Sequence, residues 1–166
     1  EASLIDISKE VDATLGKSEG LVKLYLSMPG IGLITALILL GYLGNGKRFN
    51  HAGQFSFYVG LVPRVDCSGD TNRYGPITKR GCRLLRSVMI QAAWALVRSK
   101  DGGPLKEKFQ ALAARRGKKV AIVAIARKML ECLFTMVRNG EHYRTTPPET
   151  LKRKVRKYKL KFPEAA

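Results

Sequence analysis

Residues 26–36 have the sequence Leu26-Ser27-Met28-Pro29-Gly30-Ile31-Gly32-Leu33-Ile34-Thr35-Ala36, an apolar helix end, a Pro-Gly-apolar-Gly turn and a second helix start. This order is typical of a helix-hairpin-helix element. Glycines let a backbone approach a phosphate closely, and the helix start offers free N–H groups and a positive dipole end to that anion. Gly30 and Gly32 are therefore candidate nucleic-acid contacts. The alternative is a tight interhelical turn buried in the core.

Apolar residues at helical spacing extend in both directions from this turn and predict an all-α domain. Gly, Pro, Asp, Ser and Asn are frequent in residues 60–76, which indicates a long ordered loop. The chain divides into a connector helix at 1–20, a helical domain at 21–144 and a basic, solvated tail at 145–166. Within the domain, helices are predicted over about 21–28, 33–43, 50–58, 78–99, 104–116 and 118–138.

Charge is the unusual feature of the composition. The 166 residues contain 30 Lys and Arg against 13 Asp and Glu, which leaves a formal charge of +17. Such a surplus favours a polyanionic partner, either nucleic acid or an acidic membrane surface. The uncharged stretch Ile31–Leu43 would reach only about 20 Å as a helix, short of the ~30 Å hydrocarbon layer. We therefore expect a buried helix and no membrane partner.

Cysteine and histidine content argues against a disulfide scaffold and against a structural zinc site. The three cysteines lack CxxC spacing, and His51 and His142 are isolated. This pattern suits a reducing cytosol, and no metal site is expected in this chain. Because the sequence starts with Glu1 and an acidic stretch rather than a signal peptide, we expect a fragment or processed form whose N-terminal neighbour is missing.

Ser68 is the candidate nucleophile. It precedes Gly69 in the polar loop, and six cations surround it in sequence: Arg64, Arg73, Lys79, Arg80, Arg83 and Arg86. A serine that attacks a phosphodiester needs cations around the phosphorus and a group that takes its proton. Guanidinium groups match phosphate geometry. By itself, a Ser-Gly pair more often marks a turn, and Asp66 and Asp70 are more often turn formers than bases.

The order of motifs from residue 26 to about residue 97 resembles the C-terminal domain of the one-ten family of insertion-sequence transposases, which includes the Piv and MooV DNA invertases. The matching residues are Pro29-Gly30-Ile31-Gly32 with Thr35-Ala36, Phe49, Gln54, Gly60-Leu61-Val62-Pro63, Ser68-Gly69, Ile77-Thr78-Lys79-Arg80-Gly81, Leu85-Arg86 and Ala92-Ala93-Trp94.

The resemblance implies a DNA transposase or recombinase that works in two parts. An N-terminal domain of RNase-H-like fold would carry acidic ligands for a divalent metal such as Mg²⁺, and the C-terminal domain would supply the nucleophilic serine, matched by Ser68. It also implies DNA and an element-encoded guide RNA as partners, a homo-oligomer, and a cytoplasmic, nucleoid-associated protein. The acidic domain is not in this chain, so we expect no cofactor here and no cleavage by the isolated chain.

Two other readings of the residues stay open. One is a non-catalytic helix-hairpin-helix module that binds only the nucleic-acid backbone. The other is a small basic structural protein associated with RNA. The cations of residues 151–161 are compatible with both of these functions and with a transposase, because such runs usually form a solvated tail with loose phosphate contacts.

Overall fold

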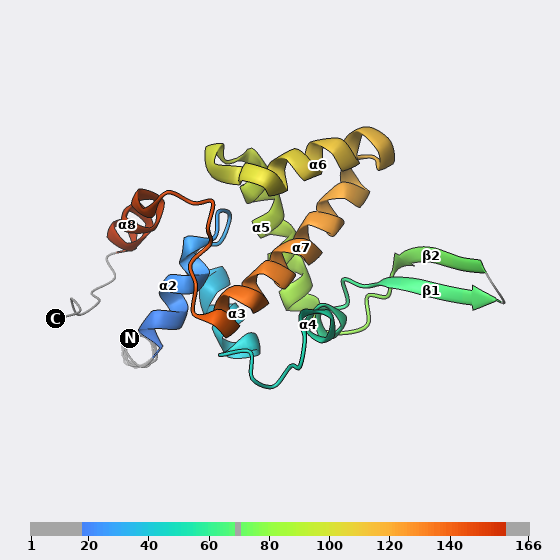
Figure 1. Cartoon of the computed structure of the whole chain (residues 1–166), viewed down its shortest axis with the longest axis horizontal. Coiled ribbons are helices and arrows are strands. Elements are labelled where there is room, and N and C mark those ends of the chain that lie inside the picture. The colour runs from blue at the N-terminus through green and yellow to red at the C-terminus, as the bar shows by residue number, and fades with distance from the viewer. Residues whose placement is uncertain (1–17, 69–70, 159–166) are drawn as a thin grey trace, which may run out of the picture.

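The computed structural model describes residues 18–68 and 71–158, and these are predominantly helical, as predicted (Figure 1). The connector helix predicted at 1–20 lies outside the described residues as far as residue 17. The elements are α2 (Glu19–Ser27), α3 (Leu33–Leu43), α4 (Ala52–Val59), β1 (Pro63–Ser68), β2 (Thr71–Ile77), α5 (Arg83–Arg98), a 3₁₀ turn (Lys100–Gly102), α6 (Gly103–Arg116), α7 (Lys118–Asn139) and α8 (Pro148–Lys157).

Helix α7 is the centre of the core, and it contacts α2, α4, α5 and α6. Its buried stripe includes Ile125, Met129 and Leu133, which are fully inaccessible to solvent. Residues four apart lie on one face of a helix, so this spacing presents a continuous apolar stripe to the neighbouring helices. After the turn at Gly117, α7 runs back along α6 (Figure 1).

The predicted limits of three helices are confirmed almost to the residue. Helix α3 covers 33–43 as predicted, α6 has Pro104 in its first turn and ends before Gly117, and α7 ends before Gly140. Proline at a helix start and glycine just beyond its end are local signals, because they depend on backbone geometry rather than on tertiary contacts. None of the helices in the described part of the chain is long and apolar enough to cross a bilayer.

Residues 63–77 form a β-hairpin, and the prediction of a long loop there is wrong. Strands β1 and β2 pair antiparallel, with an irregularity between Pro63 and Val65. Gly75 and Pro76 lie inside β2, which is possible because a two-stranded hairpin has open edges where a strand proline is tolerated. The turn-forming residues are the reason that the sequence predicted a loop, and in the described part of the chain no further strand pairs with this hairpin.

Helix α5 begins at Arg83, five residues later than predicted. Lys79 has a φ of +53° and Gly81 a φ of +129°, and neither value continues a helix. The N–H of Cys82 donates to the carbonyl of Tyr58 at 3.2 Å, and a Cβ on Gly81 would overlap that same carbonyl. The segment before α5 stays non-helical because it packs against the end of α4.

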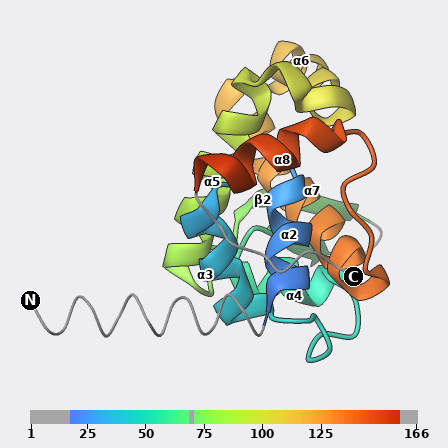
Figure 2. The same cartoon turned by 90° about the vertical axis from the view of Figure 1, so that its left-hand side faces the viewer.

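The segment predicted as a solvated tail contains α8, which packs against α2 (Figure 2). Lys154 anchors it, because Nζ donates to the carbonyls of Leu26 at 2.6 Å, Met28 at 2.8 Å and Ile31 at 2.9 Å. Burial, and then neighbouring Arg153, lower the pKa of Lys154 to about 8. At neutral pH its ammonium group still carries three donors for these three acceptors.

Replacing Lys154 by Met is expected to lower the free energy of unfolding by about 2–3 kcal/mol, because buried carbonyls lose a charged donor. Lys152→Met is the matched control on the same helix, since Lys152 is exposed, and it is expected to change stability by less than about 0.5 kcal/mol. Urea unfolding followed by circular dichroism measures both. Equal stability of the two variants would show that α8 is not anchored by Lys154.

Candidate nucleic-acid interface

The hairpin β1–β2 projects from the helical body, and Ser68 lies where β1 ends (Figure 1). In the register of the hairpin, Ser68 pairs with Thr71, and Asp66 pairs with Arg73. Ser68 is five residues beyond Pro63, which corresponds to about 17 Å of extended strand. The candidate nucleophile therefore lies at the far end of the projection, well away from the helices.

The base of the hairpin is fixed to the helical body by backbone hydrogen bonds and one arginine. The N–H of Thr78 donates to the carbonyl of Val62 at 2.9 Å. Arg86 Nη1 donates to the carbonyls of Val59 and Lys79, both at 3.1 Å. These contacts join both legs of the hairpin to the end of α4 and the start of α5, so the base cannot shift without breaking them.

The predicted cations fall into two groups. Arg64, Lys79, Arg80 and Arg83 are exposed at or near the base of the hairpin. Arg73 belongs to β2, one register pair away from the Cys67–Asn72 pair and two from the Ser68–Thr71 pair. The structure brings the base cations together, and it separates the α5 start from Ser68 by nearly the length of the hairpin. Arg86 differs from the exposed cations at the base, because its guanidinium group donates to the chain's own carbonyls.

Arg86→Met is expected to destabilise the fold by about 1–3 kcal/mol, because two carbonyls at the hairpin base lose their charged donor. Arg83→Met, one turn earlier on α5, removes an exposed cation and is expected to change stability by less than about 0.5 kcal/mol. Chemical denaturation of both variants measures the difference. Similar unfolding free energies for the pair would contradict the structural role of Arg86.

The Pro-Gly-Ile-Gly turn lies mostly in the core. Gly30 has a φ of +82°, and a Cβ added to it would lie 2.8 Å from the Leu96 backbone nitrogen and would overlap the Ala92 carbonyl oxygen. Close packing against α5 therefore explains why residue 30 is a glycine. The contacts of Gly30 and Gly32 with a phosphate stay predictions.

Gly32 lies at the start of α3, next to a cavity of about 520 Å³. The first backbone N–H groups of a helix have no acceptor within the helix. No side chain caps the start of α3, so its first N–H groups lie beside this cavity without a side-chain acceptor. A Cβ on Gly32 would lie 3.1 Å from Tyr158 Oη. The cavity is lined by Gly32, Leu33, Ile34, Thr35, Val88, Gln91 and Tyr158.

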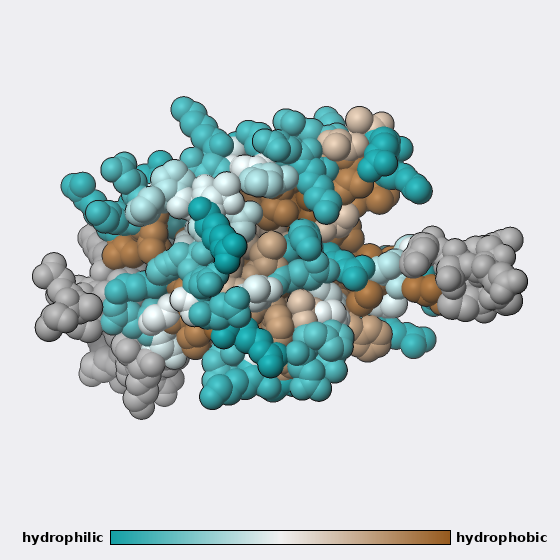
Figure 3. Space-filling model, viewed as in Figure 1, coloured by the Kyte–Doolittle hydropathy of each residue, from teal (hydrophilic) through white to brown (hydrophobic). Residues whose placement is uncertain are grey.

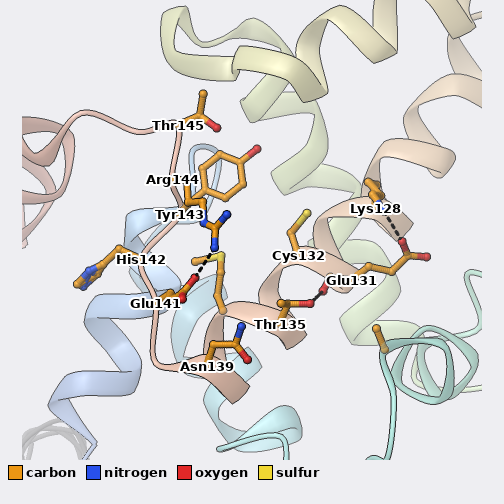
Figure 4. Close-up of a pocket in the computed structure, with 12 residues that line it drawn as sticks. Lys128, Glu131, Cys132, Thr135, Asn139, Glu141, His142, Tyr143, Arg144 and Thr145 are labelled. Atoms are coloured by element: carbon orange, nitrogen blue, oxygen red, sulfur yellow. Dashed lines mark hydrogen bonds and ion pairs between the residues drawn. The ribbon is translucent and has the colours of Figure 1, made fainter.

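A larger cavity of about 590 Å³ separates α7 from the segment that follows it (Figure 4). Its charged side chains pair with one another: Lys128 with Glu131 at 3.0 Å and Arg144 with Glu141 at 3.1 Å. Burial raises the pKa of the Cys132 thiol, which keeps it protonated at neutral pH. In this cavity, therefore, we identify no activated cysteine nucleophile.

Among the side chains that the structure describes, no group of three or more His, Cys, Asp or Glu residues lies close enough together to hold a metal ion. Cys82 and Cys132 are free thiols. These described residues therefore offer no ligand set through which a metal-dependent step can be derived.

The sequence patterns did not predict the apolar groove beside the hairpin base. It has a volume of about 390 Å³ and lies between the ends of the strands and the first turns of α7. Its lining comes from segments far apart in the chain, so no local pattern signals it. The residues are Leu61, Pro63, Gly75, Pro76, Ile77, Lys119, Val120, Val123, Ala124 and Arg127.

Comparison with known proteins agrees with the resemblance found in the sequence. The transposase IS116/IS110/IS902 family matches residues 22–110. The transposase for insertion sequence element IS1111A of Coxiella burnetii is 33% identical over 141 residues, which are 84% of this chain and 38% of that protein. A probable family 20 transposase of Pseudomonas aeruginosa is 30% identical over 146 residues, 87% of this chain and 43% of that protein.

A relative with a different name is the pilin gene-inverting protein of Moraxella lacunata. It is 32% identical over 123 residues, which are 72% of this chain and 38% of that protein. The chain thus spans less than half the length of each of these curated relatives.

Proposed function

Because the chain belongs to the transposase IS116/IS110/IS902 family, we propose that it is the DNA-binding, strand-cleaving part of a DNA transposase whose nucleophile is Ser68. The observation that carries the proposal is the position of Ser68 at the end of the projecting strand β1. A DNA strand can approach that end without entering the helical body. The names of the relatives, transposases and a gene-inverting protein, support DNA rearrangement as the reaction class.

The proposed step is a transesterification. Ser68 Oγ attacks the phosphorus of a DNA phosphodiester and forms a serine–phosphate ester, while the bond from phosphorus to one deoxyribose oxygen breaks. The hydroxyl proton leaves to a general base, and the departing sugar oxygen takes up a proton. Cations stabilise the negative charge that develops on the phosphoryl oxygens, and Arg73 on the paired strand is the predicted residue for this role.

The cations at the hairpin base would bind the same DNA strand at a distance from the cut. A strand of B-DNA carries one phosphate per about 3.4 Å of helix axis. The roughly 17 Å between Ser68 and the base therefore corresponds to about five phosphates. On this proposal Arg64, Lys79, Arg80 and Arg83 position the DNA rather than stabilise the transition state.

Three parts of the proposal extend beyond this chain. A divalent metal would be held by acidic ligands of a separate domain and would add electrophilic assistance at the phosphate. An element-encoded guide RNA would select the DNA, and the full-length protein would act as a homo-oligomer. Each follows from the family resemblance, and each leaves the role of Ser68 unchanged.

Trapping the covalent intermediate tests the proposal. The full-length protein is incubated with its DNA, quenched with denaturant, digested and examined by mass spectrometry. A nucleotide ester on the peptide that contains Ser68 is the expected result. An ester on a different residue, or complete recombination without any protein–DNA adduct, would overturn the assignment.

A second function, backbone binding without catalysis, is favoured by the uncapped first turn of α3 beside its cavity. It predicts that Gly32→Val weakens DNA binding and that Ser68→Ala changes nothing that can be measured. The adduct experiment also separates these two functions, because a module that only binds DNA forms no ester.

A further inference from the structure

We propose that the outer face of α8 is a second DNA-binding surface, which holds the backbone of duplex DNA outside the cut site. This face, here called the α8 basic face, consists of Lys152, Arg153, Arg156 and Lys157. The inference rests on the proposed function, because it takes DNA as the partner.

The α8 basic face is mounted on a fixed element. Thr150 Oγ1 donates to Asp101 Oδ2 at 3.1 Å, and Lys154 binds three carbonyls at the end of α2 and in the turn before α3. Leu151 and Tyr158 pack on the core from the inner face of the same helix. Because the inner face is anchored, the outer cations keep their spacing, and binding DNA costs little conformational entropy.

The four cations of the face are exposed and crowd one another. Lys152 and Arg156 are four residues apart, as are Arg153 and Lys157, so each pair lies on one side of the helix one turn apart. Like charges at this spacing destabilise a helix by about 0.2–0.5 kcal/mol per pair. In the described part of the chain, the ion pairs involve α2, α7 and the segment after α7, and none reaches this face. A polyanion would relieve this repulsion.

The position of α8 separates it from the catalytic hairpin. Figure 1 shows α8 and the hairpin at opposite ends of the long axis, and in Figure 3 hydrophilic side chains are visible at the α8 end as well as over much of the same face. DNA bound at the α8 basic face therefore lies away from the phosphate that Ser68 attacks. The two surfaces have separate roles, one in cleavage and one in holding DNA.

The composition of the face favours duplex backbone over single-stranded nucleic acid. Single strands are usually bound by stacking their bases on exposed aromatic side chains. The exposed residues of α8 include no aromatic side chain, and Tyr158, just after the helix, is half-buried. Lys157 Nζ lies 5.9 Å from the centroid of the Tyr158 ring, but this ring packs against the core and is not free to stack on a base. The cations of the face are therefore expected to bind phosphate oxygens without base specificity.

The test measures binding of the full-length protein to labelled duplex DNA by fluorescence anisotropy between about 50 and about 200 mM salt. In the first variant, Lys152, Arg153, Arg156 and Lys157 are all changed to Gln. In the matched control, the four exposed cations around Gly117, Arg115, Arg116, Lys118 and Lys119, are changed to Gln. Both variants lose four positive charges, so any effect of net charge alone is equal.

The α8 variant is expected to lower the slope of log affinity against log salt by about 3 and the affinity by about 10²-fold, since each lost phosphate contact removes about 0.9 from the slope. The control is expected to change the slope by less than about 1. Circular dichroism checks that α8 stays folded, and Lys152→Arg with Lys157→Arg is expected to bind as the wild type does.

Equal losses in the two charge variants, or unchanged binding by the α8 variant, would overturn this inference and leave the role of Ser68 standing. A loss of affinity for duplex RNA without a loss for duplex DNA of the same sequence would also overturn it. If the wild-type protein bound no DNA at all, both this inference and the proposed function would fail. Absence of the Ser68 ester with normal α8-dependent binding would overturn only the catalytic proposal.

Discussion

Ser68→Ala in the full-length protein is expected to lower the rate of DNA strand cleavage by about 10⁴-fold or more, because under the proposed mechanism it removes the oxygen that attacks phosphorus. The affinity for DNA is expected to stay within about twofold of the wild type, since phosphate charges and not one neutral hydroxyl dominate it. Single-turnover cleavage on a gel and anisotropy binding measure the two quantities separately.

Thr71→Val is the matched control for this experiment. Thr71 is the register partner of Ser68 on the facing strand, so it provides a second hydroxyl residue at the same end of the hairpin. Its replacement is expected to leave cleavage within about tenfold of the wild type, since it forms no bond to the DNA. If Thr71→Val abolished cleavage while Ser68→Ala did not, the nucleophile would be assigned to the wrong strand.

Gly30→Ala is expected to destabilise the fold by about 2–5 kcal/mol, a large part of the stability of a typical domain. Two costs add. A non-glycine residue at a φ of +82° costs about 1–2 kcal/mol, and forcing a methyl group against the α5 backbone costs about 1–3 kcal/mol more. The methyl group would overlap the Ala92 carbonyl, which belongs to the hydrogen-bonded backbone of α5 and cannot rotate away as a side chain would.

Gly140→Ala separates these two costs. Gly140 follows α7 with a φ of +70°, and a Cβ there would have no heavy atom within 4 Å. It therefore carries the backbone cost alone, and about 1–2 kcal/mol is expected. Thermal and urea unfolding of both variants measure the difference. Equal destabilisation would mean that close approach to α5 is not the reason for glycine at position 30.

The Gly30 experiment also bears on the meaning of the Pro-Gly-Ile-Gly motif. The sequence pattern allowed either a phosphate-binding turn or a buried interhelical turn. Packing against α5 supplies a structural reason for Gly30 that needs no ligand. Gly32, unlike Gly30, lines an open cavity. If Gly32→Val weakened DNA binding and a folded Gly30 variant did not, the DNA-binding part of the motif would be the start of α3.

Part of the candidate site could be predicted from the sequence. The family resemblance identified Ser68 in its motif, and the charge pattern identified the basic start of α5. The hairpin register was not predictable, because Pro63–Ser68 and Thr71–Ile77 form a two-stranded sheet with open edges and contain many residues that are typical of turns. Lys79 is one of the six cations that surround Ser68 in sequence, but the strands hold these two residues nearly a hairpin length apart.

Local chain signals alone determined the predominantly helical fold and the limits of α3, α6 and α7. Apolar spacing, Pro104, Gly117 and Gly140 act through the backbone of neighbouring residues, so their effect needs no distant partner. The tertiary structure alone decided the late start of α5 and the anchoring of α8 by Lys154. It also decided the hydrogen bonds of Arg86 at the hairpin base and the close packing of Gly30 on α5. Each depends on a carbonyl that another segment supplies, and the free energy of such a contact exists only after the segments have come together.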